Sequence, residues 1–146
     1  MHPFLVKEIP VDASMLDYNG HVNNIVFVKW MQDVAVEHAT RAGCTSEIYQ
    51  RLGVSWVARS HHIDYLNSAL PDDVVIVTTW IAGARKVSCR RKYVFTRKSD
   101  VMDVLAKAET EWVFVDHSTG RPRKILPEII DCFTLLGENP ELPNEA

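Results

Sequence analysis

The residues best suited to chemistry gather in one short segment, residues 16–24, with the sequence LDYNGHVNN. Asp17 supplies a carboxylate, and Asn19 and His21 follow at alternate positions, directly before a long apolar stretch. Polar groups beside a buried element must be hydrogen-bonded or must serve a function. This segment is therefore the first candidate for a functional site.

Two interpretations fit the segment. Asn, Asp and Gly are common where a chain turns into a helix, and Asn23 suits the N-cap position. Alternatively, the free N–H groups of the first helical turn stabilise negative charge at a place that an upstream carboxylate can reach. With Asp17 as base or nucleophile and the N–H of Asn24 as oxyanion donor, such a site could hydrolyse an activated acyl group.

A long helix is expected to position these groups, over residues 23–42, with Gly43 as its C-cap. Its apolar surface is wider than a single stripe, so we expect the helix to be mostly surrounded by protein. The residues that share one face at helical spacing are Phe27, Trp30, Met31, Val34 and His38.

The remaining elements are mainly strands. One strand is expected over residues 4–11, and four long strands follow the helix over residues 54–66, 74–81, 87–98 and 104–116, with a hairpin turn at 99–103. Short helices are expected at 47–52 and from Pro127. This order predicts an α+β fold in which an antiparallel sheet wraps around one long central helix. The edge strands of such a unit must be covered or paired across a dimer.

Composition sets the class of protein. The 146 residues are 47% hydrophobic, enough for one domain, which we expect over residues 1–137, followed by a flexible acidic tail at 138–146. Outside the tail the charges balance, which argues against nucleic-acid binding. Apolar runs are too short for a membrane span, and no signal peptide is apparent. Three cysteines without metal spacing indicate reduced thiols in the cytoplasm.

The string DYNGHVNN, followed by an apolar helix ending at Gly43 and four long strands, resembles a known family. It is similar to the hot-dog-fold acyl-CoA thioesterases of the 4-hydroxybenzoyl-CoA thioesterase type and to the related acyl-carrier-protein thioesterases. The resemblance extends over about residues 4–133. It implies a homodimer or homotetramer that hydrolyses acyl-CoA or acyl-carrier-protein thioesters without a cofactor or metal.

The resemblance also implies roles for individual residues. In the hydroxybenzoyl-CoA type, a catalytic Asp stands three positions before a loop Gly, which implies Asp17 and Gly20 here. The N–H that polarises the thioester carbonyl lies four residues after that Gly, at Asn24. In the carrier-protein branch, the polar site corresponds to Asp17, Asn19 and His21.

The match departs from the carrier-protein branch at one point. That branch has a Glu on the following strand, and the corresponding place falls near Ser68. The nearest acid by sequence is Asp64. His61 and His62 stand beside it, but adjacent residues of a strand point to opposite faces, which argues against a shared metal.

A run of seven bases without an acid extends from residue 85 to residue 98. It fits either a solvated strand face or a patch that binds the phosphates of coenzyme A, since guanidinium groups match phosphate geometry. The substrate-binding candidates in this run are Arg85, Lys86, Arg90 and Arg91.

Two other functions fit the same residues. A hot-dog hydratase or dehydratase would use His21 and Asp17 as an acid/base pair on an acyl thioester, and would leave the thioester intact. A non-catalytic module would bind acyl-CoA or an acyl carrier without turnover.

Overall fold

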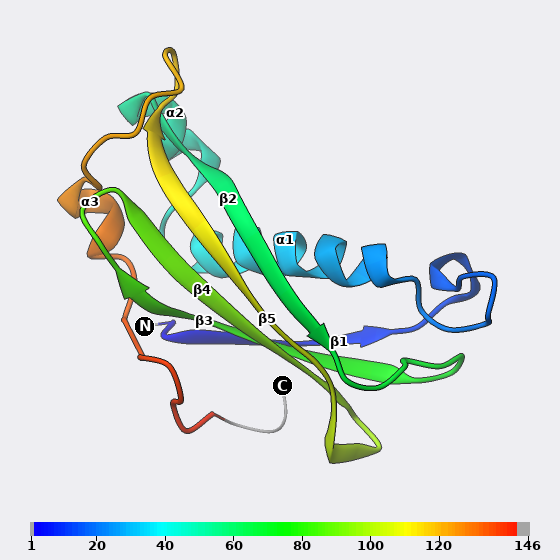
Figure 1. The fold of residues 1–146 in the computed structure, drawn as a ribbon. Helices are drawn as coiled ribbons and strands as arrows, with labels where there is room; N and C mark the ends of the chain where they lie inside the picture. Colours follow the sequence, from blue (N-terminus) through cyan, green and yellow to red (C-terminus); the bar gives the residue numbers. More distant parts are fainter. Residues whose placement is uncertain (1, 143–146) are drawn as a thin grey trace.

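The computed structural model describes residues 2–142, and its main element is a single antiparallel sheet (Figure 1). The strands stand in the order β1-β3-β4-β5-β2, and each is antiparallel to its neighbour. Their bounds are Phe4–Pro10 for β1, Val54–Tyr65 for β2, Val74–Ala84 for β3, Ser88–Arg97 for β4 and Asp100–Asp116 for β5.

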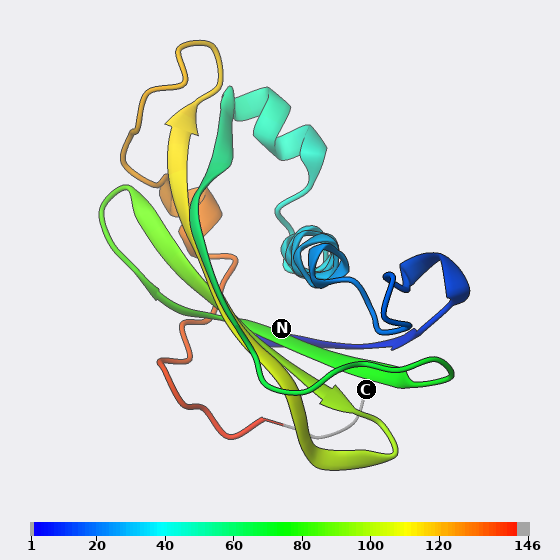
Figure 2. The same cartoon turned by 45° about the vertical axis from the view of Figure 1, so that its right-hand side comes forward.

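The helix α1 (Asn24–Arg41) lies in the curve of this sheet (Figure 2). Every residue expected on its inner face is buried, and Ala35 is buried with them. Phe27 packs edge-on against Trp30 and against Phe95 of β4, with ring centroids 5.1 Å apart in both pairs. The α+β fold with a sheet wrapped around one central helix is confirmed.

Both ends of α1 follow from local sequence. The Asn23 side chain caps the start by accepting from the N–H of Ile25 at 3.0 Å. At the other end Ala42 is the C-cap, and Gly43 follows it with φ +105°, a conformation that glycine adopts without a side-chain clash. Gly43 was expected as the C-cap itself and lies one position beyond it.

The smaller elements complete the fold. A 3-10 turn, η1 (Ala13–Met15), precedes the polar loop, α2 (Ser46–Leu52) links α1 to β2, and α3 (Pro127–Ile130) begins at a proline. In the residues that the structure describes, no helix is long and apolar enough to cross a membrane.

The expected hairpin turn at residues 99–103 is wrong. The turn occupies residues 98 and 99, and β5 already begins at Asp100. The sequence pattern hid this because the register between β4 and β5 shifts twice near Thr96, which breaks the alternation. Arg97 holds this end of the sheet through ion pairs with Asp73 and Asp103.

The segment after α3 runs along the sheet. The N–H of Leu136 donates to Ile81, and the indole of Trp80 donates to the carbonyl of Gly137 at 3.0 Å. Glu138, at the start of the expected tail, pairs with Arg90 and with Lys92. Flexibility of the tail stays a prediction, and residues 143–146 lie outside the described residues.

Candidate active site

The polar loop between η1 and α1 folds back on itself. The N–H of Asp17 donates to the carbonyl of His21 at 2.7 Å, and the N–H of Asn23 donates to Met15 at 2.8 Å. Gly20 takes φ +75° at the tip, a conformation that favours glycine. The chain on both sides of this turn therefore lies directly before the first turn of α1.

The Asp17 carboxylate organises the loop through one oxygen. Its Oδ1 accepts the N–H groups of Asn19 at 2.9 Å and of His21 at 3.2 Å. Among residues 2–142 no partner faces Oδ2, and the side chain is half-buried. One oxygen thus fixes the geometry of the loop while the other stays available for chemistry.

The start of α1 supplies a hydrogen-bond donor. Asn23 satisfies the amide of Ile25 with its side chain and that of Val26 with its carbonyl. The amide of Asn24 has no acceptor among the described residues, as expected for the first residue of a helix. On the other side of this turn the Tyr65 hydroxyl donates to the carbonyl of Asn24 at 2.8 Å and ties the helix start to the end of β2.

The structure places Asp17, Asn19 and His21 on this one loop and Asn24 directly after it, as the first residue of α1. The side chain of Asn19 is exposed and that of His21 is half-buried. Neighbouring Tyr18 is fully exposed. Their catalytic roles stay predictions.

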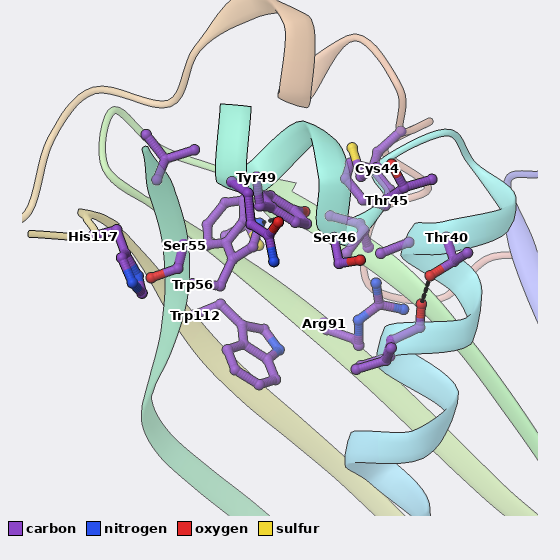
Figure 3. A pocket seen from close by; sticks show the side chains of 18 of the residues that line it. Thr40, Cys44, Thr45, Ser46, Tyr49, Ser55, Trp56, Arg91, Trp112 and His117 are labelled. Atoms are coloured by element: carbon purple, nitrogen blue, oxygen red, sulfur yellow. Dashed lines mark hydrogen bonds between the residues drawn. The ribbon is translucent and has the colours of Figure 1, made fainter. Parts of the chain in front are cut away.

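A large cavity lies at the opposite end of α1 (Figure 3). Its volume is about 560 Å³, and it is lined by the C-terminal half of α1, by α2 and by strands β2, β3, β4 and β5. Most of its lining is apolar or aromatic, and none of the polar loop contributes to it. The cavity is lined among others by Ala35, Ala39, Tyr49, Trp56, Ile81 and Phe133.

One strongly polar side chain is built into the wall of this cavity. Arg91 is 3% exposed, and its Nη1 donates to Nδ1 of His38 at 2.9 Å and to the hydroxyl of Thr79 at 3.1 Å. Since a guanidinium can only donate, Nδ1 of His38 is the acceptor, and Nε2 carries the proton that bonds to the carbonyl of His2 at 2.6 Å.

These contacts fix the charges of the network. Burial, and then the positive charge of Arg91, lower the pKa of His38 to about 4, so this histidine is neutral at neutral pH. Burial also lowers the pKa of Arg91, but arginine remains protonated in proteins. Burial raises the pKa of the lining thiols Cys44 and Cys89 to about 12 and about 11. Neither thiol is therefore ionised at neutral pH.

The expected basic patch is divided between two faces of the sheet. Arg85 and Lys86 are exposed in the β3–β4 turn, and Arg90 is half-buried beside Glu109 and Glu138. Arg91 points the other way, into the interior, because adjacent residues of a strand alternate. The structure therefore does not bring Arg91 together with the other three bases.

The remaining candidates are accounted for by local contacts. Asp64 is exposed and lies 3.3 Å from His62, while His61 bonds to the hydroxyl of Thr110 at 2.8 Å. The described residues contain no group of three or more His, Cys, Asp or Glu side chains that could hold a metal ion.

Sequence reasoning missed the cavity. The signal available was Arg91 itself, which shares one face of a strand with Cys89, Tyr93 and Phe95. A charged residue in a row of buried apolar ones indicates an interior polar site. The cavity next to it depends on how α2 and β2 diverge, which no local pattern reports.

Comparison with known proteins places the chain in a family. Residues 11–133 match the model of the thioesterase-like superfamily. Over 107 residues the chain is 23% identical to an oleoyl-acyl carrier protein thioesterase from Arabidopsis thaliana, covering 69% of this chain and 29% of that enzyme. The chain thus corresponds to less than a third of the length of this curated relative.

Solved structures share the fold. A DHNA-CoA thioesterase from Staphylococcus aureus aligns with a TM-score of 0.79 at 15% identity, covering 88% of this chain and 87% of that one. A second Staphylococcus aureus protein, solved in complex with CoA, aligns with a TM-score of 0.81 at 16% identity, covering 88% and 80% of the two chains. With its family model matched over most of its length, this chain belongs to the thioesterase-like superfamily and has the hot-dog fold.

Proposed function

We propose that the protein hydrolyses acyl thioesters of coenzyme A or of an acyl carrier protein. The observation that carries the proposal is that Asp17 has a carboxylate oxygen with no hydrogen-bond partner among residues 2–142, in the loop that leads directly into the amide donor of Asn24 at the start of α1. Membership of the superfamily and the acyl-carrier-protein and CoA thioesterases among its relatives support the reaction class.

In the proposed reaction the thioester oxygen accepts from the N–H of Asn24, where the helix dipole stabilises the developing negative charge. Oδ2 of Asp17 either takes a proton from the attacking water or attacks the carbonyl carbon itself. In the second case a mixed anhydride forms, the thiolate leaves, and water then cleaves the anhydride. Asn19 and His21 orient the water or the carboxylate.

The phosphates of coenzyme A are assigned to the exposed bases Arg85 and Lys86 and to the half-buried Arg90. The ion pairs of Arg90 with Glu109 and Glu138 partly neutralise this group. For this reason we expect phosphate binding here to be moderate and sensitive to salt.

We also propose that the active unit is a dimer formed along β2. This strand lies at one edge of the sheet. Along its twelve residues, the side that faces away from β5 pairs with no strand among the described residues. Large apolar side chains are exposed on α1 and β2, namely Ile25, Val36 and Tyr65, and would be available for such a contact.

Antiparallel pairing of two β2 strands would complete the site. The Tyr65 end of β2 is tied to Asn24, whereas the other end, at Val54, lines the cavity. Within one chain these two parts are separated by most of the helix, about 20 Å at 1.5 Å per residue. In the dimer the polar loop of one copy lies beside the cavity of the other.

A thiol-release assay tests the reaction. Short, medium, long and aromatic acyl-CoAs are incubated with the protein, and free thiol is followed with a thiol reagent. Release of thiol is expected. Substrate that is consumed with its thioester intact would indicate a hydratase instead, and ligand-dependent thermal stabilisation without turnover would indicate a binding module.

Mixing two inactive variants tests the shared site. Asp17→Asn removes the base, and Thr40→Trp fills the mouth of the cavity. After the two are unfolded and refolded together, half of the dimers carry one intact site, so about a quarter of the wild-type activity should return. No recovery in mixed dimers would mean that both parts act within one chain.

A further inference from the structure

The cavity at the C-terminal end of α1 contains a cation whose charge is not compensated. No Asp or Glu is among the residues that line the cavity, and no carboxylate of residues 2–142 lies within 4.0 Å of the Arg91 guanidinium. We propose that Arg91 binds a carboxylate, so that the cavity accepts an apolar chain whose end within it is a carboxylate. As a statement about substrate, this rests on the proposed thioesterase function.

The guanidinium is oriented for such a ligand. Both N–H groups of Nη1 are used, by His38 and Thr79, which fixes the plane of the group. Nε and Nη2 have no acceptor among the described residues. Figure 3 shows the guanidinium pointing into the space between α1 and the sheet. The remaining N–H groups can therefore make the two parallel hydrogen bonds typical of an arginine–carboxylate pair.

The surroundings do not supply a substitute anion. His38 on α1 donates nothing to Arg91 and is neutral, and Tyr93 and Thr110 on the adjoining strands are hydrogen-bonded to each other at 3.1 Å. The other basic residue of the lining, His117, is exposed. Since a buried charge without a counter-ion is costly, an anionic ligand gains more here than a neutral one.

A second donor lies on the same face of the sheet. Trp112 of β5 is opposite Cys89 and thus diagonal to Arg91, and its indole N–H is buried without an acceptor among the described residues. Figure 3 shows its nitrogen on the side of Arg91. A carboxylate between the two side chains would satisfy both.

The rest of the cavity suits an apolar body. Its volume of about 560 Å³ and its walls of Ala35, Ala39, Trp56 and Phe133 are typical of a site for a small, mainly apolar ligand. The carboxylate can come from two sources. It is either the distal group of an acyl thioester made from a dicarboxylic acid, or the carboxylate of a free fatty acid.

Direct binding tests the carboxylate site without reference to activity. Calorimetry with octanoate and 1-octanol compares two chains of equal length. We expect octanoate to bind the wild type at least about tenfold more tightly, because charged hydrogen bonds contribute strongly. Arg91→Gln should abolish this preference, and Arg90→Gln, on the other face of the same strand, should keep it. Equal or tighter binding of octanol to the wild type would overturn the proposal.

Kinetics then separates the two sources. The mono-CoA thioester of octanedioic acid is compared with octanoyl-CoA, and we expect kcat/KM for the diacid thioester to be about tenfold or more higher. This preference should be lost in Arg91→Gln and kept in Arg121→Gln, a control at an exposed arginine after β5 that has no part in the proposed site. Octanoate binding without this preference would overturn the dicarboxylic substrate and assign the site to free acids. Octanoate binding without any thiol release would refute the proposed function and leave the carboxylate site standing.

The comparison of octanoate with 1-octanol on the wild-type protein tests the proposal without any substitution. If Arg91→Gln fails to fold, Trp112→Phe provides the second variant, because it removes the indole N–H and keeps an aromatic ring. It should weaken octanoate several-fold and leave octanol unchanged. Equal weakening of both ligands would mean that Trp112 serves only packing.

Discussion

The two ends of α1 are built in opposite ways. At the N-terminal end, a half-buried loop presents polar groups that are held by backbone hydrogen bonds, with Asp17 at their centre. At the C-terminal end, a deep cavity is formed mainly by apolar side chains around one buried cation, Arg91. The first end is defined by a local sequence motif, and the second by the packing of two helices and four strands.

This difference suggests a division of labour along one helix. The reaction needs few atoms in fixed positions, which a tight turn before a helix provides. Selection of the acyl group needs a cavity of defined volume with walls around it, and only several elements together can form such a cavity. Substitutions at the two ends should therefore change different measured quantities.

The largest effect is expected for Asp17→Asn. The amide keeps an oxygen that can accept from Asn19 and His21, so the loop should persist while the base is lost, and kcat should fall about 100- to 1,000-fold or more. Steady-state kinetics on several acyl-CoAs measures this, with the melting temperature as the check on folding.

Asp12→Asn is the matched control. Asp12 accepts the N–H of Ser14 at 2.9 Å in the neighbouring turn and has no place in the proposed chemistry. Its replacement should leave kcat within about twofold. If Asp17→Asn retained full kcat in a folded protein, Asp17 would have no catalytic role.

At the other end, His38 should make stability depend on pH. Its pKa in the folded protein, about 4, lies below the ordinary value of 6.5. As the pH falls from 6.5 to 4, His38 is therefore protonated in the unfolded chain before it is protonated in the folded protein. The associated stability is complete above pH 6.5 and decreases toward pH 4. At about pH 4.5 the loss should amount to about 2 kcal/mol.

Urea unfolding of the wild type and of His38→Gln, at about pH 7 and pH 4.5, isolates this contribution from the other titrating groups. The drop in unfolding free energy should be smaller in the variant by about 2 kcal/mol. Identical drops would show that His38 does not remain neutral in the folded protein.

A smaller effect is expected where β2 meets the helix start. Tyr65→Phe removes the hydroxyl that bonds to the carbonyl of Asn24, and should cost about 1 kcal/mol or less of stability. Because the bond holds the first turn of α1, kcat should also fall while KM changes little. A change in KM alone would place Tyr65 in substrate binding and outside the oxyanion site.

The smallest effect is expected on the outer face of the sheet. Glu138→Gln would release Arg90 and Lys92 from their ion pairs and lower KM for acyl-CoA about two- to threefold at low salt. An N-acetylcysteamine thioester, which lacks the phosphates, should show no change. An equal change for both substrates would argue against phosphate binding at this face.

Much of this arrangement is readable from sequence, and the exceptions have physical causes. Local patterns were sufficient for the buried face of α1 and for the loop that contains Asp17, because helical spacing and turn chemistry act over a few residues. The start of β5 was misjudged because two register shifts broke the alternation.

The basic run shows a different kind of limit. Arg90 and Arg91 are neighbours in sequence, yet the pleat sends one to the outer face and the other into the core. Composition alone groups them as one patch. Their separation follows only when the strand and its buried face are considered together, and the cavity beside Arg91 requires the complete fold.

The open side of β2 has a consequence for handling the protein. The backbone N–H and C=O groups along the free edge of its twelve residues can pair with any extended chain. A single copy can therefore pair with an unrelated strand as well as with a second β2. If the proposed dimer forms along β2, dilution that separates the two copies would favour precipitation over a stable monomer. Preparations should remain stable longest at protein concentrations high enough to keep the β2 edge of every copy paired.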